Sequence, residues 1–387
     1  MLPGAAPADR PSASNAAPSS GPTTGATAGA SQSPGALHVH SVFSFDGHGE
    51  VETIAAAARA TGLEWIGMTD HDSLGARYAG FEGRREGVHV VVGYEWTPPG
   101  GDHALMYGSP DAIPAPLART VVADEALRIV TAHGGMAFVA HPDEQRAALA
   151  HLPPLPWHDW SVRGFTGIEL WNFMSEWAER LTRLNALHHA IWPGMRMRGP
   201  TARSLAWWDA LNRLAPAGGF HGGPRLTVGV SGVDAHGEGI RVLGRHWTVF
   251  PYERVFRTYT NVLLLDAPLP ADAGAAREAI LRAIGEGRVL FADRTRGDPL
   301  GASFEIRAPA ARLGVGGVGH LPAGAQAEVR LEVPETATLR ILHDGETLAS
   351  GQGRELMMAA GAPGAYRAEA ERGGRPWLFT NPIVLLP

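Results

Sequence analysis

The chain has 387 residues, 44% of them hydrophobic, which is enough for one large and one small domain. Its formal net charge of −6 gives no excess of positive charge for binding duplex nucleic acid. The composition does not determine the oligomeric state. Cysteine and lysine are both absent, which excludes disulfides, thiolate metal sites, cysteine nucleophiles and lysine Schiff bases. The remaining chemistry uses imidazoles, carboxylates, hydroxyls and metal ions.

The first 35 residues are rich in Ala, Ser, Pro, Gly and Thr, and their only charges are Asp9 and Arg10. They lack the apolar stretch of a signal peptide, so we predict a disordered low-complexity tail over residues 1–35. The chain contains no apolar run of the length that spans a membrane. We therefore expect a cytoplasmic protein with no membrane partner.

Residues 36–296 alternate short apolar runs with helical patterns, which predicts an α/β fold with mostly parallel strands. The predicted strands are 36–40, 65–69, 88–92, 104–107, 136–140, 167–171, 227–230 and 262–265, and the predicted helices are 51–61, 123–133, 176–189 and 275–284. Segments 142–166 and 190–226 are interpreted as long loops, which are typical of lids or substrate walls. Their tryptophans could line an apolar or aromatic substrate, namely Trp157, Trp160, Trp192, Trp207 and Trp208.

From residue 297 onward the pattern changes to apolar and polar residues in alternation, over 303–308, 327–333, 338–342, 366–371 and 377–386. Asp344-Gly345 and Gly373-Gly374 are hairpin-turn signals. This indicates a small antiparallel β-sandwich over residues 297–387. Its two histidines have no metal-ligand spacing, so we interpret it as a packing or substrate-shaping module.

Imidazoles and carboxylates gather at the ends of the apolar runs, where α/β barrels place their active sites. The candidates are His38, His40, Asp46, His71, Glu95, His103, His141, Asp234 and His236. These side chains are ligands for Zn²⁺, Mn²⁺ or Fe. Residues i and i+2 of a strand share a face, so His38/His40 and Asp234/His236 can each supply two ligands from one strand. Together the segments predict a multi-metal hydrolase.

These segments also resemble, in order, the motifs of the PHP (polymerase and histidinol phosphatase) family. They are His38-Val39-His40-Ser41, Ser44-Phe45-Asp46-Gly47, Thr69-Asp70-His71, Gly93-Tyr94-Glu95, Ala140-His141-Pro142 and Asp234-Ala235-His236. Two positions depart from the family pattern, Ala36 in place of an aspartate and Phe45 in place of a serine. The segments Gly167–Asn172, Gly287-Arg288 and Trp377–Ile383 resemble the CehA/McbA-like branch of the family.

The resemblance implies a distorted (βα)7 barrel over residues 36–296, holding two or three divalent Mn, Zn or Fe ions. The first metal would be bound by His38, His40, Glu95 and Asp234. The second would share Glu95 as a bridge and take His141, with His103 as an extra candidate. The third would take Asp46, His71 and His236. Asp70 would orient His71 or a neighbour, while Glu169 and Asn172 would either touch substrate or pack in the barrel.

The function that this implies is hydrolysis by a metal-bridging hydroxide, with Glu95, Asp234 and His236 as the catalytic residues. The preferred substrate is a small phosphate ester: a nucleotide, a sugar phosphate or an oligonucleotide end, because several cations neutralise phosphate well. Two alternatives stay open. One is a carbamate or carboxylic ester hydrolase of the CehA/McbA type, and the other is a non-catalytic domain that keeps the PHP fold.

Overall fold

The computed structural model describes residue 25 and residues 29–113, 118–146, 153–182, 184–191, 197–214, 226–242 and 245–387. Most of the predicted tail lies outside these ranges. Its last residues do not behave as a tail, because strand β1 (Ser31–Val39) starts five residues before the predicted barrel and pairs with β12 (Tyr259–Leu265). The boundary at residue 35 is therefore wrong: Ser33 and Pro34 are ordered in a sheet.

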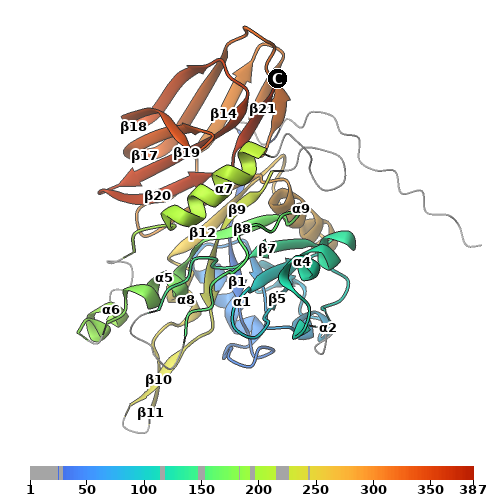
Figure 1. The fold of residues 1–387 in the computed structure, drawn as a ribbon. Coiled ribbons are helices and arrows are strands. Elements are labelled where there is room, and N and C mark those ends of the chain that lie inside the picture. The colour runs from blue at the N-terminus through green and yellow to red at the C-terminus, as the bar shows by residue number, and fades with distance from the viewer. Residues whose placement is uncertain are drawn as a thin grey trace, which may run out of the picture.

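Parallel strands form the part of the sheet that carries most candidate ligands (Figure 1). Strand β1 lies between β2 (Trp65–Met68) and β9 (Val228–Ala235), and β2 also pairs with β4 (Val88–Val92). On the other side, β9 pairs with β8 (Gly167–Asn172), which pairs with β7 (Met136–Val139). The parallel strands place their carboxyl ends on one side, which brings distant segments of the sequence together.

Two antiparallel pairings complete this arrangement. Strand β6 (Ala104–Tyr107) pairs with both β7 and β5 (Tyr94–Trp96), and β5 continues β4 after Gly93, so the sheet closes into a barrel. Short β3 (Gly83–Arg85) pairs antiparallel with β4, and β10 (Gly239–Val242) forms a separate hairpin with β11 (Arg245–Thr248). The fold is thus mixed α/β with a large mixed sheet rather than a plain repeat of parallel strand–helix units.

The helices in the described ranges are α1 (Val51–Ala60), α2 (Gly75–Tyr78), α4 (Ala123–Ala132), α5 (Phe173–Arg180), α6 (Ala186–Ile191), α7 (Ala202–Leu214), α8 (Tyr252–Val255) and α9 (Ala273–Gly285). Several of them, α1, α4 and α9 among them, pack against strands of the sheet. In α1 the buried residues Val51, Ile54, Ala55 and Ala58 follow the helical period. The side chain of Asn172 caps α5 by accepting a hydrogen bond from the amide of Ser175.

The C-terminal strands extend the same sheet instead of forming a separate one. Strand β13 (Val289–Asp293) pairs with β12 on one side and β20 (Arg375–Thr380) on the other. Strand β20 joins β19 (Gly364–Arg372), and β19 joins β17 (Ala327–His343) and β21 (Ile383–Leu386). Strand β17 also pairs with β18 (Glu346–Ala360) and β14 (Ser303–Ala308), which pairs with β15 (Ala311–Gly314), while β16 (Val318–His320) pairs parallel with β21.

Both hairpin turns are confirmed, because Asp344-Gly345 and Gly373-Gly374 adopt positive φ angles between directly paired strand ends. The separate β-sandwich predicted over residues 297–387 is not confirmed, because its strand β20 pairs with β13 of the preceding region. Val262 and Leu290 of the first region share one apolar core with Leu339 and Trp377 of the second. Helix α7 lies against the C-terminal strands (Figure 1), where Arg367 pairs with Asp209 at 2.6 and 2.8 Å.

Asn381 links the C-terminal strands to the barrel through its buried amide. Its Oδ1 accepts from the Gly229 amide at 2.6 Å, and its Nδ2 donates to the carbonyls of Gly229 and Val289. We expect Asn381→Ala to lower the free energy of unfolding by about 1–3 kcal/mol for each backbone group left unpaired. Denaturant unfolding measures this, with Gln352→Ala on exposed β18 as the control. Equal stability of the two variants would contradict the prediction.

Candidate metal centre

His38 and His40 leave β1 at its carboxyl end, but not as a regular strand would place them. The pairing register of β1 shifts between Leu37 and Val39, and His38 has a φ of 64°. The prediction that His38 and His40 share a face because they alternate along a regular strand is therefore wrong, although both rings reach Asp234. The Nε2 atoms of both histidines lie 3.3 Å from Oδ1 of Asp234.

Left-handed backbone recurs at two more candidate ligands. His141 has a φ of 28° and Asp234 a φ of 52°. Such conformations cost about 1–3 kcal/mol each in residues other than glycine, and they concentrate at functional sites. Gly232 on β9 allows the crowding nearby, because a Cβ there would collide with the Glu169 carboxylate and lie 2.9 Å from Cβ of His38. The fold thus accepts strain to bring these side chains together.

Glu95 stands at the centre of the group and is 1% exposed. Its Oε2 atom lies 3.2, 3.4 and 3.2 Å from ring nitrogens of His38, His40 and His71. Its Oε1 atom lies 2.8 and 3.3 Å from ring nitrogens of His103 and His141. Each oxygen thus faces a different set of imidazoles, which is the arrangement that a bridging carboxylate requires.

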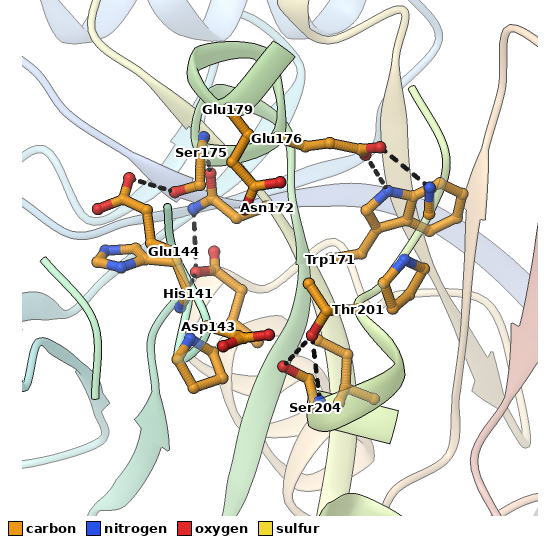
Figure 2. A pocket seen from close by; sticks show the side chains of 15 residues that line it. His141, Asp143, Glu144, Trp171, Asn172, Ser175, Glu176, Glu179, Thr201 and Ser204 are labelled. Carbon is orange, nitrogen blue, oxygen red and sulfur yellow. Dashed lines mark hydrogen bonds between the residues drawn. The ribbon is translucent and has the colours of Figure 1, made fainter. Parts of the chain in front are cut away.

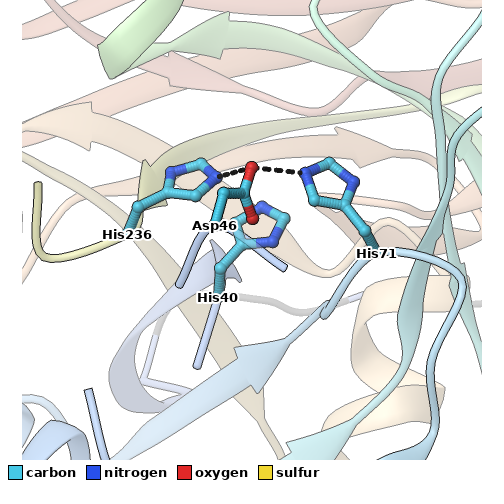
Figure 3. A group of neighbouring side chains, drawn as sticks. All are labelled: His40, Asp46, His71 and His236. Atoms are coloured by element: carbon cyan, nitrogen blue, oxygen red, sulfur yellow. Dashed lines mark ion pairs between the residues drawn. The ribbon is translucent and has the colours of Figure 1, made fainter. Parts of the chain in front are cut away.

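An outer group surrounds Asp46, the most exposed of the candidate ligands. Its Oδ2 atom lies 3.2 Å from Nε2 of His71 and 3.4 Å from Nε2 of His236. Figure 3 shows Asp46 between these two rings, with both ion pairs drawn as dashed lines. The rings of His40 and His236 stack with centroids 4.0 Å apart. His40 therefore belongs spatially to the inner and the outer group at once.

Within the described residues, three sets of side chains offer ligand atoms close enough for one ion. They are His38, His40 and Asp234; His38, Glu95 and His141; and His40, Asp46, His71 and His236. Compared with the predicted sets, Glu95 is missing from the first, His38 joins the second and His40 joins the third. His103 belongs to none of the three, and contacts the group through Glu95.

The electrostatics of these residues fit divalent cations. Burial raises the pKa of Glu95, but the imidazoles of His38, His71 and His103 outweigh it and hold the pKa well below its usual range. Burial and the neighbouring His236 lower the pKa of His40 to about 3, and its Nε2 has no hydrogen-bond partner among the described residues. A neutral imidazole with an orphaned nitrogen beside ionised carboxylates is a donor set suited to Zn²⁺, Mn²⁺ or Fe.

Buried residues behind the group orient it, and sequence reasoning underrated one of them. Glu169 on β8 accepts from Nδ1 of His38 at 2.7 Å and from the backbone amide of His141 at 2.9 Å. This leaves Nε2 of His38 free to face Glu95 and Asp234. Asp70 accepts from the amide and hydroxyl of Ser41, so it orients the loop after His40 rather than His71. In the sequence, the only feature that drew attention to Glu169 was its position within the predicted strand 167–171.

A small pocket of about 40 Å³ opens beside His141 (Figure 2). Its lining is acidic, with Asp143, Glu144, Glu169, Glu176 and Glu179 among the residues around it. Glu144 and Glu176 are committed to internal hydrogen bonds. Burial raises the pKa of Glu179 to about 7, with Glu176 adding to the rise and Arg180 opposing it. The pocket therefore favours neutral or cationic groups over bare anions.

The tryptophan wall expected from segments 142–166 and 190–226 is corrected by the structure. Residues 202–214 form helix α7, where Trp207 and Trp208 are buried, and Trp157 is buried too. Trp160 is partly covered by the guanidinium of Arg203, and Trp192 lies outside the described residues. Similarly, the helix predicted over 176–189 is two helices, α5 and α6. Trp157, Trp207 and Trp208 therefore belong to the apolar core rather than to a wall around a substrate.

Metal affinity should rise with pH. Burial lowers the pKa of His141, but Glu95 and Glu144 outweigh it and raise the pKa to about 9. A cation that binds this imidazole must displace its proton, so below pH 9 we expect apparent affinity to gain about tenfold per pH unit for that proton. Metal titration by calorimetry between pH 6 and pH 9 in two buffers measures both affinity and proton release. A flat profile without proton release would contradict it.

None of the helices in the described ranges combines the length and apolar character that a membrane crossing requires. Comparison with curated proteins gives no match. Among solved structures, a two-domain protein from Bacteroides vulgatus containing a predicted PHP-like metal-dependent phosphoesterase is 12% identical, over 93% of this chain and 98% of that one, with a TM-score of 0.42. PsfC from Pseudomonas syringae is 12% identical over 64% and 88% (TM-score 0.38).

A lesion-specific endonuclease from Pyrococcus furiosus is 13% identical, over 76% of this chain and 60% of that one, with a TM-score of 0.35. The match to a protein family is confined to the first part of the barrel, residues 36–115, and the family is the PHP domain. That stretch supplies His38, His40, Asp46, His71, Glu95 and His103. The chain therefore contains a match to the PHP domain over the segment that builds most of the candidate metal centre.

Proposed function

We propose that this chain is a metal-dependent hydrolase that cleaves small phosphate esters, such as a nucleotide, a sugar phosphate or an oligonucleotide end. The observation that carries the proposal is Glu95, a buried carboxylate whose two oxygens face separate sets of imidazoles. The adjoining group of Asp46, His71 and His236 provides further ligand atoms toward solvent. Two or three cations held side by side suit a phosphoryl group, which carries charge on several oxygens.

Bound divalent cations would acidify a water molecule and polarise the phosphoryl oxygen under attack. The residues of the chain do the positioning. Glu95 and Asp234 both contact the rings of His38 and His40 and so keep these inner ligands in place. Glu169 fixes the orientation of the His38 ring. Burial lowers the pKa of His236, but bonds to Asp46 and Glu238 raise it well above the usual value. With only the two inner cations bound, protonated His236 at the open end of the group would be placed to pass a proton to the leaving oxygen.

The acidic pocket beside His141 favours a second candidate, hydrolysis of a neutral carbamate or carboxylic ester, as in the CehA/McbA-like branch. Its carboxylates disfavour an anionic substrate unless the cations screen them. A purely structural PHP-fold domain is the weakest candidate, because it would not need eight candidate ligands to converge on Glu95 and its neighbours.

The decisive experiment combines metal content with a pair of substrates. We expect two to three Mn, Zn or Fe ions per chain after reconstitution, and faster hydrolysis of p-nitrophenyl phosphate than of p-nitrophenyl acetate. Preference for the acetate would favour the ester hydrolase. If the protein binds less than one ion per chain and hydrolyses neither substrate, the hypothesis that it is a hydrolase is wrong.

We also propose that residues 36–296 correspond to the distorted (βα)7 barrel of the PHP fold and that residues 297–387 shape or support it. The closed ring of β1, β2, β4, β5, β6, β7, β8 and β9 supports the first part. The shared core around Val262 and Trp377 supports a stabilising role for the second part.

A further inference from the structure

The candidate metal centre is closed at one end and open at the other. The side chains of His38 and Glu95 are 0% and 1% exposed, whereas Asp46 is 35% exposed. Phe45, the next residue along, is 82% exposed. A substrate that approaches Asp46 from solvent therefore passes an exposed aromatic ring next to the outer ligand group.

An exposed phenylalanine alone means little, since many proteins expose single apolar side chains. Phe45 differs because one face of its ring is already covered. Its ring stacks on the imidazole of His71, with centroids 4.7 Å apart and planes inclined by 20°. The high exposure of the residue leaves the opposite face of the ring open to solvent.

The loop that carries Phe45 is fixed on both sides of it. The amide of Ser44 donates to the carbonyl of Ser41 at 2.9 Å, and the hydroxyl of Ser44 donates to Asp46 at 2.8 Å. The amide of His71 donates to the same hydroxyl at 3.2 Å. These bonds fix the backbone beside Phe45 and the stack on His71 positions its ring before any ligand binds, which lowers the entropic cost of stacking.

We propose that Phe45 is the stacking platform for an aromatic ring carried by the substrate, next to a phosphoryl group held at Asp46, His71 and His236. The substrate class is thus an aryl or nucleobase-bearing phosphate ester rather than an aliphatic sugar phosphate. This inference rests on the proposed phosphoesterase function and names its specificity. Trp157, Trp207 and Trp208 do not serve this purpose, because they are buried.

The test compares phenyl phosphate with glycerol phosphate as substrates of the metal-loaded enzyme. We expect Phe45→Ala to raise KM for phenyl phosphate about five- to tenfold, the usual worth of one aromatic pair, and to leave kcat and KM for glycerol phosphate within about twofold. Phe45→Trp should retain the wild-type preference. Val42→Ala, an exposed apolar residue of the same loop, is the matched control. Equal losses on both substrates would overturn the platform and make Phe45 a cover for His71.

Inhibitor binding separates this inference from the proposed function. Calorimetry with phenylphosphonate and methylphosphonate needs no turnover. The wild-type protein should bind phenylphosphonate more tightly, and Phe45→Ala should erase the difference. If the wild type hydrolyses no phosphate ester, the proposed function fails while this measurement still decides the platform. Equal affinity of the wild type for the two phosphonates would overturn the inference.

Discussion

Glu95→Gln should reduce the hydrolysis rate at least ~10²-fold, and it should weaken more than one metal site at once. Changes in residues that only orient ligands often cost 10–100-fold, and Glu95 contacts the ligand rings directly. The substitution keeps the shape but removes a charge that faces imidazoles on both sides. It also places an NH₂ group against ring nitrogens such as Nε2 of His141. Metal analysis and single-turnover rates on the purified variant measure both effects.

His103→Ala is the informative comparison for Glu95→Gln. His103 hydrogen-bonds to Oε1 of Glu95, its ring packs edge-on against that of His141, and it belongs to none of the three ligand sets among the described residues. We expect a smaller loss of rate and metal, confined to the side of His141. Glu86→Gln, on an exposed turn, controls for the loss of a carboxylate elsewhere. If Glu95→Gln is near normal while His103→Ala loses metal and activity, the bridge is misassigned.

Hydrophobic patterning predicted the strands of the barrel well. Residues 88–92 and 104–107 match β4 and β6 as predicted, because each is a short apolar run bounded by polar residues or glycine. Helix α7 was missed because Trp207 and Trp208 were interpreted as loop residues, although they are buried on one side of a helix. Strand β18 was missed because most of its residues are exposed, which leaves little alternation to detect.

The identity of the candidate ligands could be predicted, but their geometry could not. The family resemblance grouped His38, Glu95 and Asp234, and the structure places Nε2 of His38 3.2 Å from Glu95 and 3.3 Å from Asp234. Positive φ angles at His38 and Asp234 depend on long-range packing, which no local pattern encodes. The same holds for Glu169, whose contact with His38 spans 131 residues of sequence.

Glu169 provides the sharpest test of whether buried support matters as much as the ligands. Its Oε1 accepts from Nδ1 of His38, and its Oε2 accepts from the amide of His141 and from Nδ2 of Asn172. All three partners present N–H groups. A carboxylate can accept from each of them, whereas a glutamine amide has only one accepting oxygen.

In Glu169→Gln, the NH₂ group must therefore face either His141 and Asn172, where it meets other donors, or Nδ1 of His38. In the second case the His38 proton moves to Nε2, the atom that faces Glu95 and Asp234, and blocks it as a ligand. We expect a loss of about 10–100-fold in metal affinity and rate. The control is Glu176→Gln, another buried carboxylate, bonded to Trp171 and Tyr259, and this variant should lose stability but keep its metal. Unchanged metal affinity in Glu169→Gln would show that the ring of His38 is held by packing alone.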